Sequence, residues 1–142
     1  MVYVDCMRSG RLPPVAAVIG FIDCINRGDI DGLGKLMTED HELVVFGEEA
    51  VRGRVRNVHA WAGYATAYPD YVIYPRTVAE PRDGCVAVLG NTTGSHLGLA
   101  DHEERALSVI WFAEVRDGLL CCWRLLEDTP ERRAELGLSP LA

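Results

Sequence analysis

The sequence has few basic residues and no long apolar run. It has 14 Lys and Arg residues against 21 Asp and Glu, which gives a formal net charge of −7. No basic run offsets this charge, so nucleic acid is excluded as a partner. The apolar stretch over residues 14–25 contains Asp23 and is too short to span a bilayer, and no signal-peptide cleavage pattern follows it. We therefore expect neither a nucleic-acid nor a membrane partner.

The cysteines also lack a recognisable pattern. There are five, at positions 6, 24, 85, 121 and 122. Their number is odd, two are adjacent, and none has the spacing of a zinc site. This usage disfavours disulfides and predicts a reducing, cytoplasmic location without a bound metal.

Length and organisation indicate one domain. A chain of 142 residues is large enough to bury a single core, and it contains no internal repeat and no low-complexity segment. We expect a loose leader over residues 1–13 and one domain over residues 14–142.

The first half of the chain has helical spacing. Apolar residues three and four apart predict a helix over residues 15–27 that ends at Gly28, and a short helix follows through Met37. A strand is expected over residues 42–46 and a helix over 56–68. His41 is expected in a loop, at the surface.

The second half reads as strands. They are predicted over residues 71–80, 85–96, 106–116 and 119–127, with a last helix starting at Thr129 and Pro130. The acidic stretch over residues 101–104 is interpreted as an exposed polar turn. Helices followed by strands predict an α+β fold in which a bent sheet packs on its helices.

The last two strands form a hairpin, and its register decides which side chains share a face. A three-residue loop over residues 116–118 would place Trp111 opposite Trp123. A two-residue loop would shift the register by one and break this set. The other face would then carry an apolar row, for which a homodimer is the simplest cover. This row consists of Ile110, Phe112, Leu120 and Leu126.

Five phrases, in order, resemble the SnoaL-like branch of the nuclear-transport-factor-2-like superfamily. They are residues 21–29 (FIDCINRGD), the Gly53 turn into a helix, residues 68–71 (YPDY), residues 93–98 (TGSHLG), and residues 115–118 (VRDG) followed by Trp123. The resemblance covers residues 14–138. It implies a cone-shaped α+β barrel, with a curved and mostly antiparallel sheet, an internal apolar cavity and frequent dimerisation through the outer sheet face. Because this fold carries isomerases, cyclases, hydrolases and binding proteins, it does not specify a function.

The carboxylates that those enzymes use are missing at the matching positions. Isomerases of the superfamily carry an aspartate near the end of the first strand, where this chain has Val-Val-Phe-Gly at residues 44–47. The limonene-epoxide-hydrolase branch has an Arg-x-Asp pair and a further aspartate, which match Gly90, Thr92 and Leu125. SnoaL-type cyclases have an aspartate at the position of Trp111. None of these activities transfers directly.

Three ionisable residues remain as candidates: His96, Arg105 and Glu127. The up-and-down path of the strands brings them to the same side. His96 matches a histidine in the pocket of SnoaL-like cyclases, and histidine works as acid or base at neutral pH. We predict His96 as acid/base and Glu127 as its orienting group. The alternative is a salt bridge between Glu127 and Arg105, with His96 in a surface loop. The predicted substrate-binding residues are Arg105, Trp111, Trp123, Leu125, Thr92, Tyr64, Tyr71 and Phe46.

The sequence therefore predicts a cofactor-independent enzyme that cyclises, isomerises or hydrolyses an apolar small molecule. Two alternatives stay open. One is a non-catalytic module that binds an apolar small molecule. The other is a dimeric scaffold whose cavity is filled by its own side chains.

Overall fold

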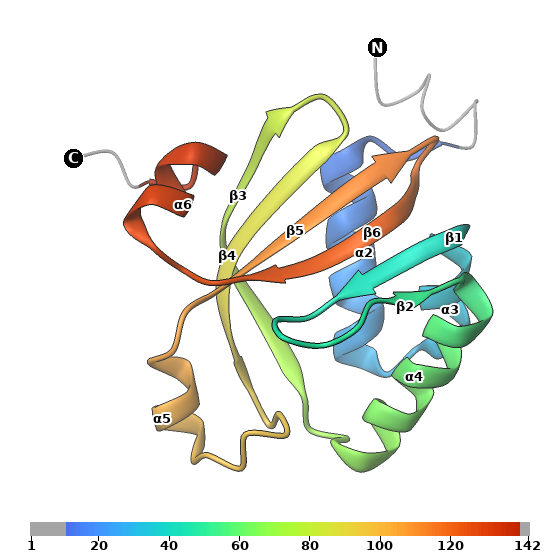
Figure 1. Cartoon of the computed structure of the whole chain (residues 1–142). Helices are drawn as coiled ribbons and strands as arrows, with labels where there is room; N and C mark the ends of the chain where they lie inside the picture. The colour runs from blue at the N-terminus through green and yellow to red at the C-terminus, as the bar shows by residue number, and fades with distance from the viewer. Residues whose placement is uncertain (1–10, 140–142) are drawn as a thin grey trace.

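A computed structural model describes residues 11–139, so the expected leader lies almost wholly outside the described residues. Its elements are shown in Figure 1. They are α2 (Pro14–Arg27), α3 (Ile30–Lys35), β1 (Met37–Val44), β2 (Val51–Arg52), α4 (Arg54–Ala67), β3 (Val72–Arg82), β4 (Cys85–Thr93), α5 (Asp101–Arg105), β5 (Val109–Arg116), β6 (Leu119–Leu126) and α6 (Pro130–Leu136).

The strands form one curved sheet that does not close into a barrel. Their order is β2-β1-β6-β5-β4-β3, and every neighbouring pair is antiparallel except β1 with β6. Helix α2 packs across one face against β3, β4, β5 and β6, while α3 and α4 lie near β1 (Figure 1). The predicted α+β fold is confirmed. In the described part of the chain, no helix is long and apolar enough to cross a membrane.

The main core lies between α2 and the sheet. Phe21 of α2 is fully buried, and its ring centroid lies 5.0 Å from that of Trp123, which stacks on Trp111 at 6.3 Å. The helix ends where the sequence predicts, because Gly28 adopts the left-handed conformation and closes the last turn with its backbone N–H. The apolar face of α2 therefore packs against the two tryptophans of the sheet.

A smaller core lies on the opposite face of the sheet. There Leu136 and Leu138, in and just after α6, pack with Ile110 of β5 and with Leu89 of β4. Phe112 and Leu126 are half-buried beside them. The apolar row expected to face a second copy is thus partly covered by the chain's own last helix.

The hairpin register differs from the prediction. The loop has two residues, Asp117 and Gly118, both with positive φ, and Arg116 pairs with Leu119. A bulge then adds one residue to β6, so that Trp111 pairs with Leu125 rather than with Trp123. The bulge restores the alternation that the shorter loop had broken, and both tryptophans still face the main core. The predicted face of Leu120 was wrong: it precedes the bulge and is fully buried in the main core.

Five further expectations are corrected. Met37 begins β1 instead of ending a helix, β4 ends at Thr93, and β5 begins only at Val109. The segment expected as a polar turn is the short helix α5. His41 is fully buried in β1, where its Nδ1 lies 2.7 Å from the Leu120 carbonyl oxygen. Strand β1 pairs in parallel with β6, and no local pattern in the sequence indicates this pairing of two distant segments.

Candidate functional site

His96 and Tyr64 form a hydrogen-bonded pair between the loop after β4 and helix α4. The Tyr64 Oη lies 2.9 Å from the His96 Nδ1, and the backbone N–H of His96 donates to the same oxygen at 3.2 Å. The Tyr64 ring packs against Tyr68 at 4.8 Å and edge-on against Tyr71 at 5.1 Å. These contacts hold the imidazole in a defined position relative to α4.

The pair has two possible proton arrangements. If the Tyr64 hydroxyl donates to Nδ1, the neutral imidazole carries its proton on Nε2. If Nδ1–H donates to the Tyr64 Oη, Nε2 is free to accept a proton and the phenol O–H is free to donate one. Burial raises the pKa of Tyr64, and the nearby charge of Glu104 adds to this effect, so the phenol keeps its proton near neutral pH. The second arrangement thus offers a base and an acid side by side.

Glu104 supports the loop that carries His96. Its carboxylate, on α5, is only 1% exposed and accepts hydrogen bonds from the Thr92 hydroxyl and, at 3.3 Å, from the backbone N–H of Ser95. Because Ser95 precedes His96 in the chain, these bonds anchor the loop to α5.

Sequence reasoning missed Glu104 because its acidic neighbourhood is typical of a solvated turn. The available signal was Thr92, an inward hydroxyl on a buried strand that requires a partner. The carboxylate that contacts Thr92 thus comes from α5, an element that follows β4 in the chain.

A pocket of about 460 Å³ opens between the sheet and α4; we call it the sheet-side pocket. The sheet contributes apolar walls, α4 and the turn after it contribute aromatic rings, and His96 lies at the edge. The lining residues are Leu43, Val45, Glu48, Glu49, Val51, Ala60, Trp61, Tyr64, Tyr68, Tyr71, His96, Trp111, Trp123 and Leu125.

Six of the predicted site residues lie in this lining: His96, Trp111, Trp123, Leu125, Tyr64 and Tyr71. The other four lie elsewhere. Thr92 bonds to Glu104, and Phe46 is 54% exposed. Arg105 is exposed and its guanidinium lies 5.7 Å from the centroid of the Tyr74 ring. Glu127 is exposed, just past the end of β6. The polar partner of His96 in the structure is Tyr64.

Tyr71 presents the second phenol of the pocket. Deep burial raises its pKa strongly, so the hydroxyl stays protonated. No described residue hydrogen-bonds to this hydroxyl, although the ring lines the pocket. It is therefore a neutral donor available to an oxygen atom of a bound molecule.

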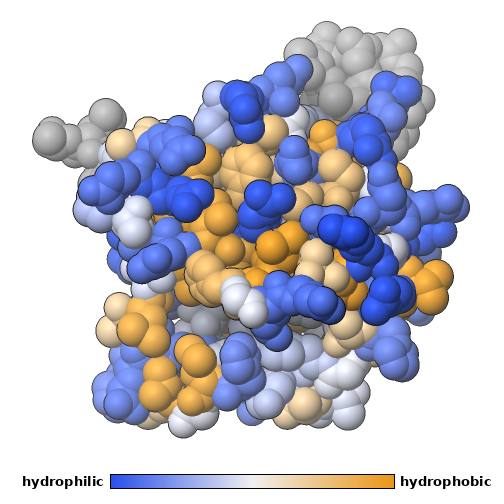
Figure 2. All heavy atoms as spheres, viewed as in Figure 1, coloured by the Kyte–Doolittle hydropathy of each residue, from blue (hydrophilic) through white to orange (hydrophobic). Residues whose placement is uncertain are grey.

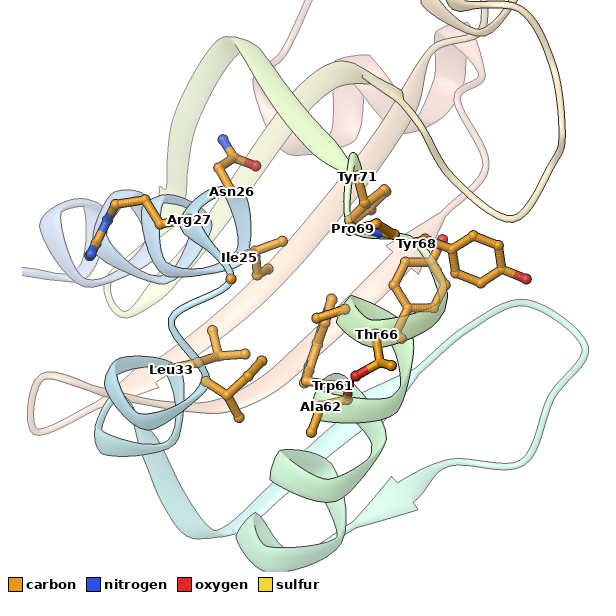
Figure 3. Close-up of a pocket in the computed structure, with 14 residues that line it drawn as sticks. Ile25, Asn26, Arg27, Leu33, Trp61, Ala62, Thr66, Tyr68, Pro69 and Tyr71 are labelled. Atoms are coloured by element: carbon orange, nitrogen blue, oxygen red, sulfur yellow. Dashed lines mark hydrogen bonds between the residues drawn. The ribbon is translucent and has the colours of Figure 1, made fainter.

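A second pocket, of about 430 Å³, lies among α2, α3 and α4; we call it the helix-side pocket (Figure 3). Trp61, Tyr64, Tyr68 and Tyr71 line both pockets, so this aromatic wall separates them. Within the described residues, no group of three His, Cys, Asp or Glu side chains is placed to hold a metal ion.

The chain belongs to the SnoaL-like domain family, whose model matches residues 18–123. This confirms the resemblance inferred from its sequence phrases. No curated protein matches the chain.

Solved structures with the same fold are similar over most of the chain. TerC, co-crystallised with polyporic acid, has 20% identity over 89% of this chain and 99% of its own, with a TM-score of 0.63. A protein from Sinorhizobium meliloti, provisionally named a polyketide cyclase, has 19% identity over 83% and 98%, with a TM-score of 0.66. An LEH-like epoxide hydrolase from M. tuberculosis has 17% identity over 87% and 88%, with a TM-score of 0.64. At these identities the likeness shows the fold alone.

Proposed function

We propose that this SnoaL-like protein binds an apolar small molecule in the sheet-side pocket and transfers protons to and from it without a cofactor. The observation that carries the proposal is the hydrogen bond of 2.9 Å between the Tyr64 Oη and the His96 Nδ1 at the edge of that pocket. The names of the similar structures, a cyclase, an epoxide hydrolase and a protein crystallised with polyporic acid, support a small organic substrate.

The chemistry follows from the second proton arrangement of the pair. The His96 Nε2 removes a proton from a carbon next to a carbonyl group, and Nδ1–H remains bonded to Tyr64. Negative charge then develops on the carbonyl oxygen. The hydroxyls of Tyr64 and Tyr71 are the donors that would stabilise it, because both are protonated and line the pocket. Such a step begins a cyclisation or an isomerisation.

The test is deuterium exchange at the α-carbon of 1-tetralone, an apolar aryl ketone, followed by NMR in D₂O. We expect exchange above the buffer rate, a loss of about 10²–10⁴-fold in His96→Ala and a smaller loss in Tyr64→Phe. The matched control is His59→Ala, which removes an exposed histidine of α4. An equal rate in the wild type and His96→Ala would overturn the role of His96. Glu127→Gln tests separately the orienting role that the sequence predicts for Glu127, and an unchanged exchange rate would refute that role.

A non-catalytic binding module is the second candidate. The apolar sheet wall of Leu43, Val51 and Leu125 favours it, as does the lack of the superfamily's carboxylates at their usual positions. Mass spectrometry of molecules that co-purify with the protein distinguishes the two, since a binding module retains its ligand unchanged. The pocket in front of Trp111 and Trp123 argues against a scaffold filled by its own side chains.

We also propose that the outer sheet face forms a homodimer. Half-buried Arg124 lies on this face, opposite Phe112, and its buried Nε has no partner among the described residues. A carboxylate of a second copy would satisfy it. Analytical ultracentrifugation of the wild type and Phe112→Glu checks this: we expect a dimer that dissociates in the variant, and a monomeric wild type would refute the interface.

A further inference from the structure

The helix-side pocket is preformed and has a mixed polar and apolar lining. Figure 3 shows Ile25 and Leu33 on one side of it and Trp61 of α4 on the other. Ile30, at the start of α3, also lines it. The three helices hold these side chains apart, which leaves the volume of about 430 Å³.

Three polar side chains around this pocket are already paired, whereas the buried Trp61 Nε1–H has no partner among the described residues. The Asn26 amide donates to the Ile73 carbonyl oxygen at 2.9 Å and accepts from the Ile73 N–H at 2.8 Å. The Thr66 hydroxyl donates to the Ala62 carbonyl oxygen, and Arg27 forms ion pairs with two neighbouring aspartates. A molecule that enters the pocket therefore meets aliphatic side chains, aromatic rings and neutral polar atoms, because Arg27, the charged side chain of the lining, is ion-paired.

The aromatic wall connects this pocket to the proposed site. The Tyr64 ring lies at its centre, with ring centroids 6.1 Å from Trp61, 4.8 Å from Tyr68 and 5.1 Å from Tyr71. The same Tyr64 carries the hydrogen bond to His96. A molecule packed on the helix side thus contacts the ring whose hydroxyl orients the imidazole.

We propose that the helix-side pocket is a second binding site, which takes a small, flat, uncharged molecule, and that its occupant changes the environment of His96 through the shared aromatic wall. Flatness follows from the ring surfaces, and lack of charge follows because Arg27, the charged side chain of the lining, is already ion-paired. One oxygen acceptor suits the Trp61 Nε1–H, which is buried and has no partner among the described residues. This proposal goes beyond the acid–base function, because the second site exists whether or not His96 is catalytic.

The test uses prodan, a neutral naphthalene ketone whose fluorescence reports burial. We expect two molecules bound per chain, and NMR contacts from the dye to the methyl groups of Ile30 and Leu33, which line the helix-side pocket alone. One molecule per chain, with contacts only to Leu43 and Val45 of the sheet-side pocket, would overturn the second site.

Two matched variants separate the pockets. Ala65 lines only the helix-side pocket and Val45 only the sheet-side pocket. Ala65→Phe should weaken dye binding in the helix-side pocket by about tenfold or more and leave binding in the sheet-side pocket unchanged. Val45→Phe should weaken binding in the sheet-side pocket and leave the helix-side pocket unchanged. If either variant fails to fold, the NMR contacts in the wild type still decide.

The coupling has its own readout. In Val45→Phe, where the dye can enter only the helix-side pocket, binding should shift the imidazole signals of His96. Binding without such a shift would refute the coupling through Tyr64. Neither result depends on turnover, so failure of this proposal and failure of the acid–base function are distinguishable.

Discussion

Removal of the Glu104 carboxylate tests how the loop of His96 is held. In Glu104→Ala, the Thr92 hydroxyl and the Ser95 N–H both lose their acceptor. A buried donor left unsatisfied costs about 1–3 kcal/mol, which gives about 2–6 kcal/mol for the two. Relief from burying a carboxylate and entry of water both reduce this, so we expect a loss of about 2–4 kcal/mol in the free energy of unfolding.

Glu104→Gln is the informative counterpart. Its amide oxygen can still accept from Ser95, and its NH₂ group can donate to Thr92, so we expect a loss below about 1 kcal/mol. The variant nevertheless removes a negative charge that raises the pKa of Tyr64. The pKa of Tyr64 should therefore fall in Glu104→Gln while the fold is kept.

Urea unfolding measures the stability of both variants, and NMR titration of the tyrosine ring carbons measures the pKa of Tyr64. Amide hydrogen exchange at His96 should accelerate in Glu104→Ala and stay slow in Glu104→Gln. Glu103→Gln is the matched control, because Glu103 is an exposed neighbour on the same helix. If Glu104→Ala and Glu104→Gln were equally stable, or if the pKa of Tyr64 did not move in Glu104→Gln, the reasoning would be refuted.

Two further predictions concern stability and backbone geometry. Burial lowers the pKa of His41 in the folded state, so its contribution to stability is fully present above the unfolded pKa of about 6.5 and is lost as the pH falls, by up to about 1.4 kcal/mol per pH unit. Urea unfolding at a series of pH values should show this slope in the wild type and in the exposed-site control His59→Ala but not in His41→Leu, and an unchanged slope in His41→Leu would contradict it. Gly94 and Gly98 both have positive φ, but only at Gly94 would an added Cβ clash with the Asp70 carbonyl oxygen. The loss in free energy of unfolding should thus be larger in Gly94→Ala than in Gly98→Ala, by about 1 kcal/mol or more. Equal melting temperatures of the two variants would argue against a clash between the added Cβ and Asp70.

Local sequence patterns were enough to predict the main helices and strands of the fold. The apolar spacing from Val15 to Ile25 predicts α2, because a helix buries one face at that period. Along β4, Val88 lies in the main core and its neighbour Leu89 in the smaller core, as the alternation of a strand requires. The short phrases around Gly28, Pro69 and Gly118 indicated the family, since turn residues mark the ends of elements at characteristic distances. Sequence reasoning also placed six of the predicted site residues on the walls of one pocket.

Local patterns did not predict the register of the hairpin formed by β5 and β6. Asp117 and Gly118 are compatible with loops of two or three residues, and the shorter loop with a bulge beyond it is the one that buries Leu120 in the main core. Neither the loop length nor the bulge has a signal in hydrophobic alternation.

By itself, the sequence determined the class of fold and the order of its elements, because these depend on local spacing, whereas the choice of His96 as the chemical group to examine came from its resemblance to SnoaL-like cyclases. Tertiary structure alone decided that Tyr64 is the partner of His96 and that Glu104 turns inward to Thr92. It also decided that four aromatic residues separate two pockets. These features depend on how α4, α5 and the curved sheet meet in space, and contacts between segments so far apart in the chain leave no periodic trace in it.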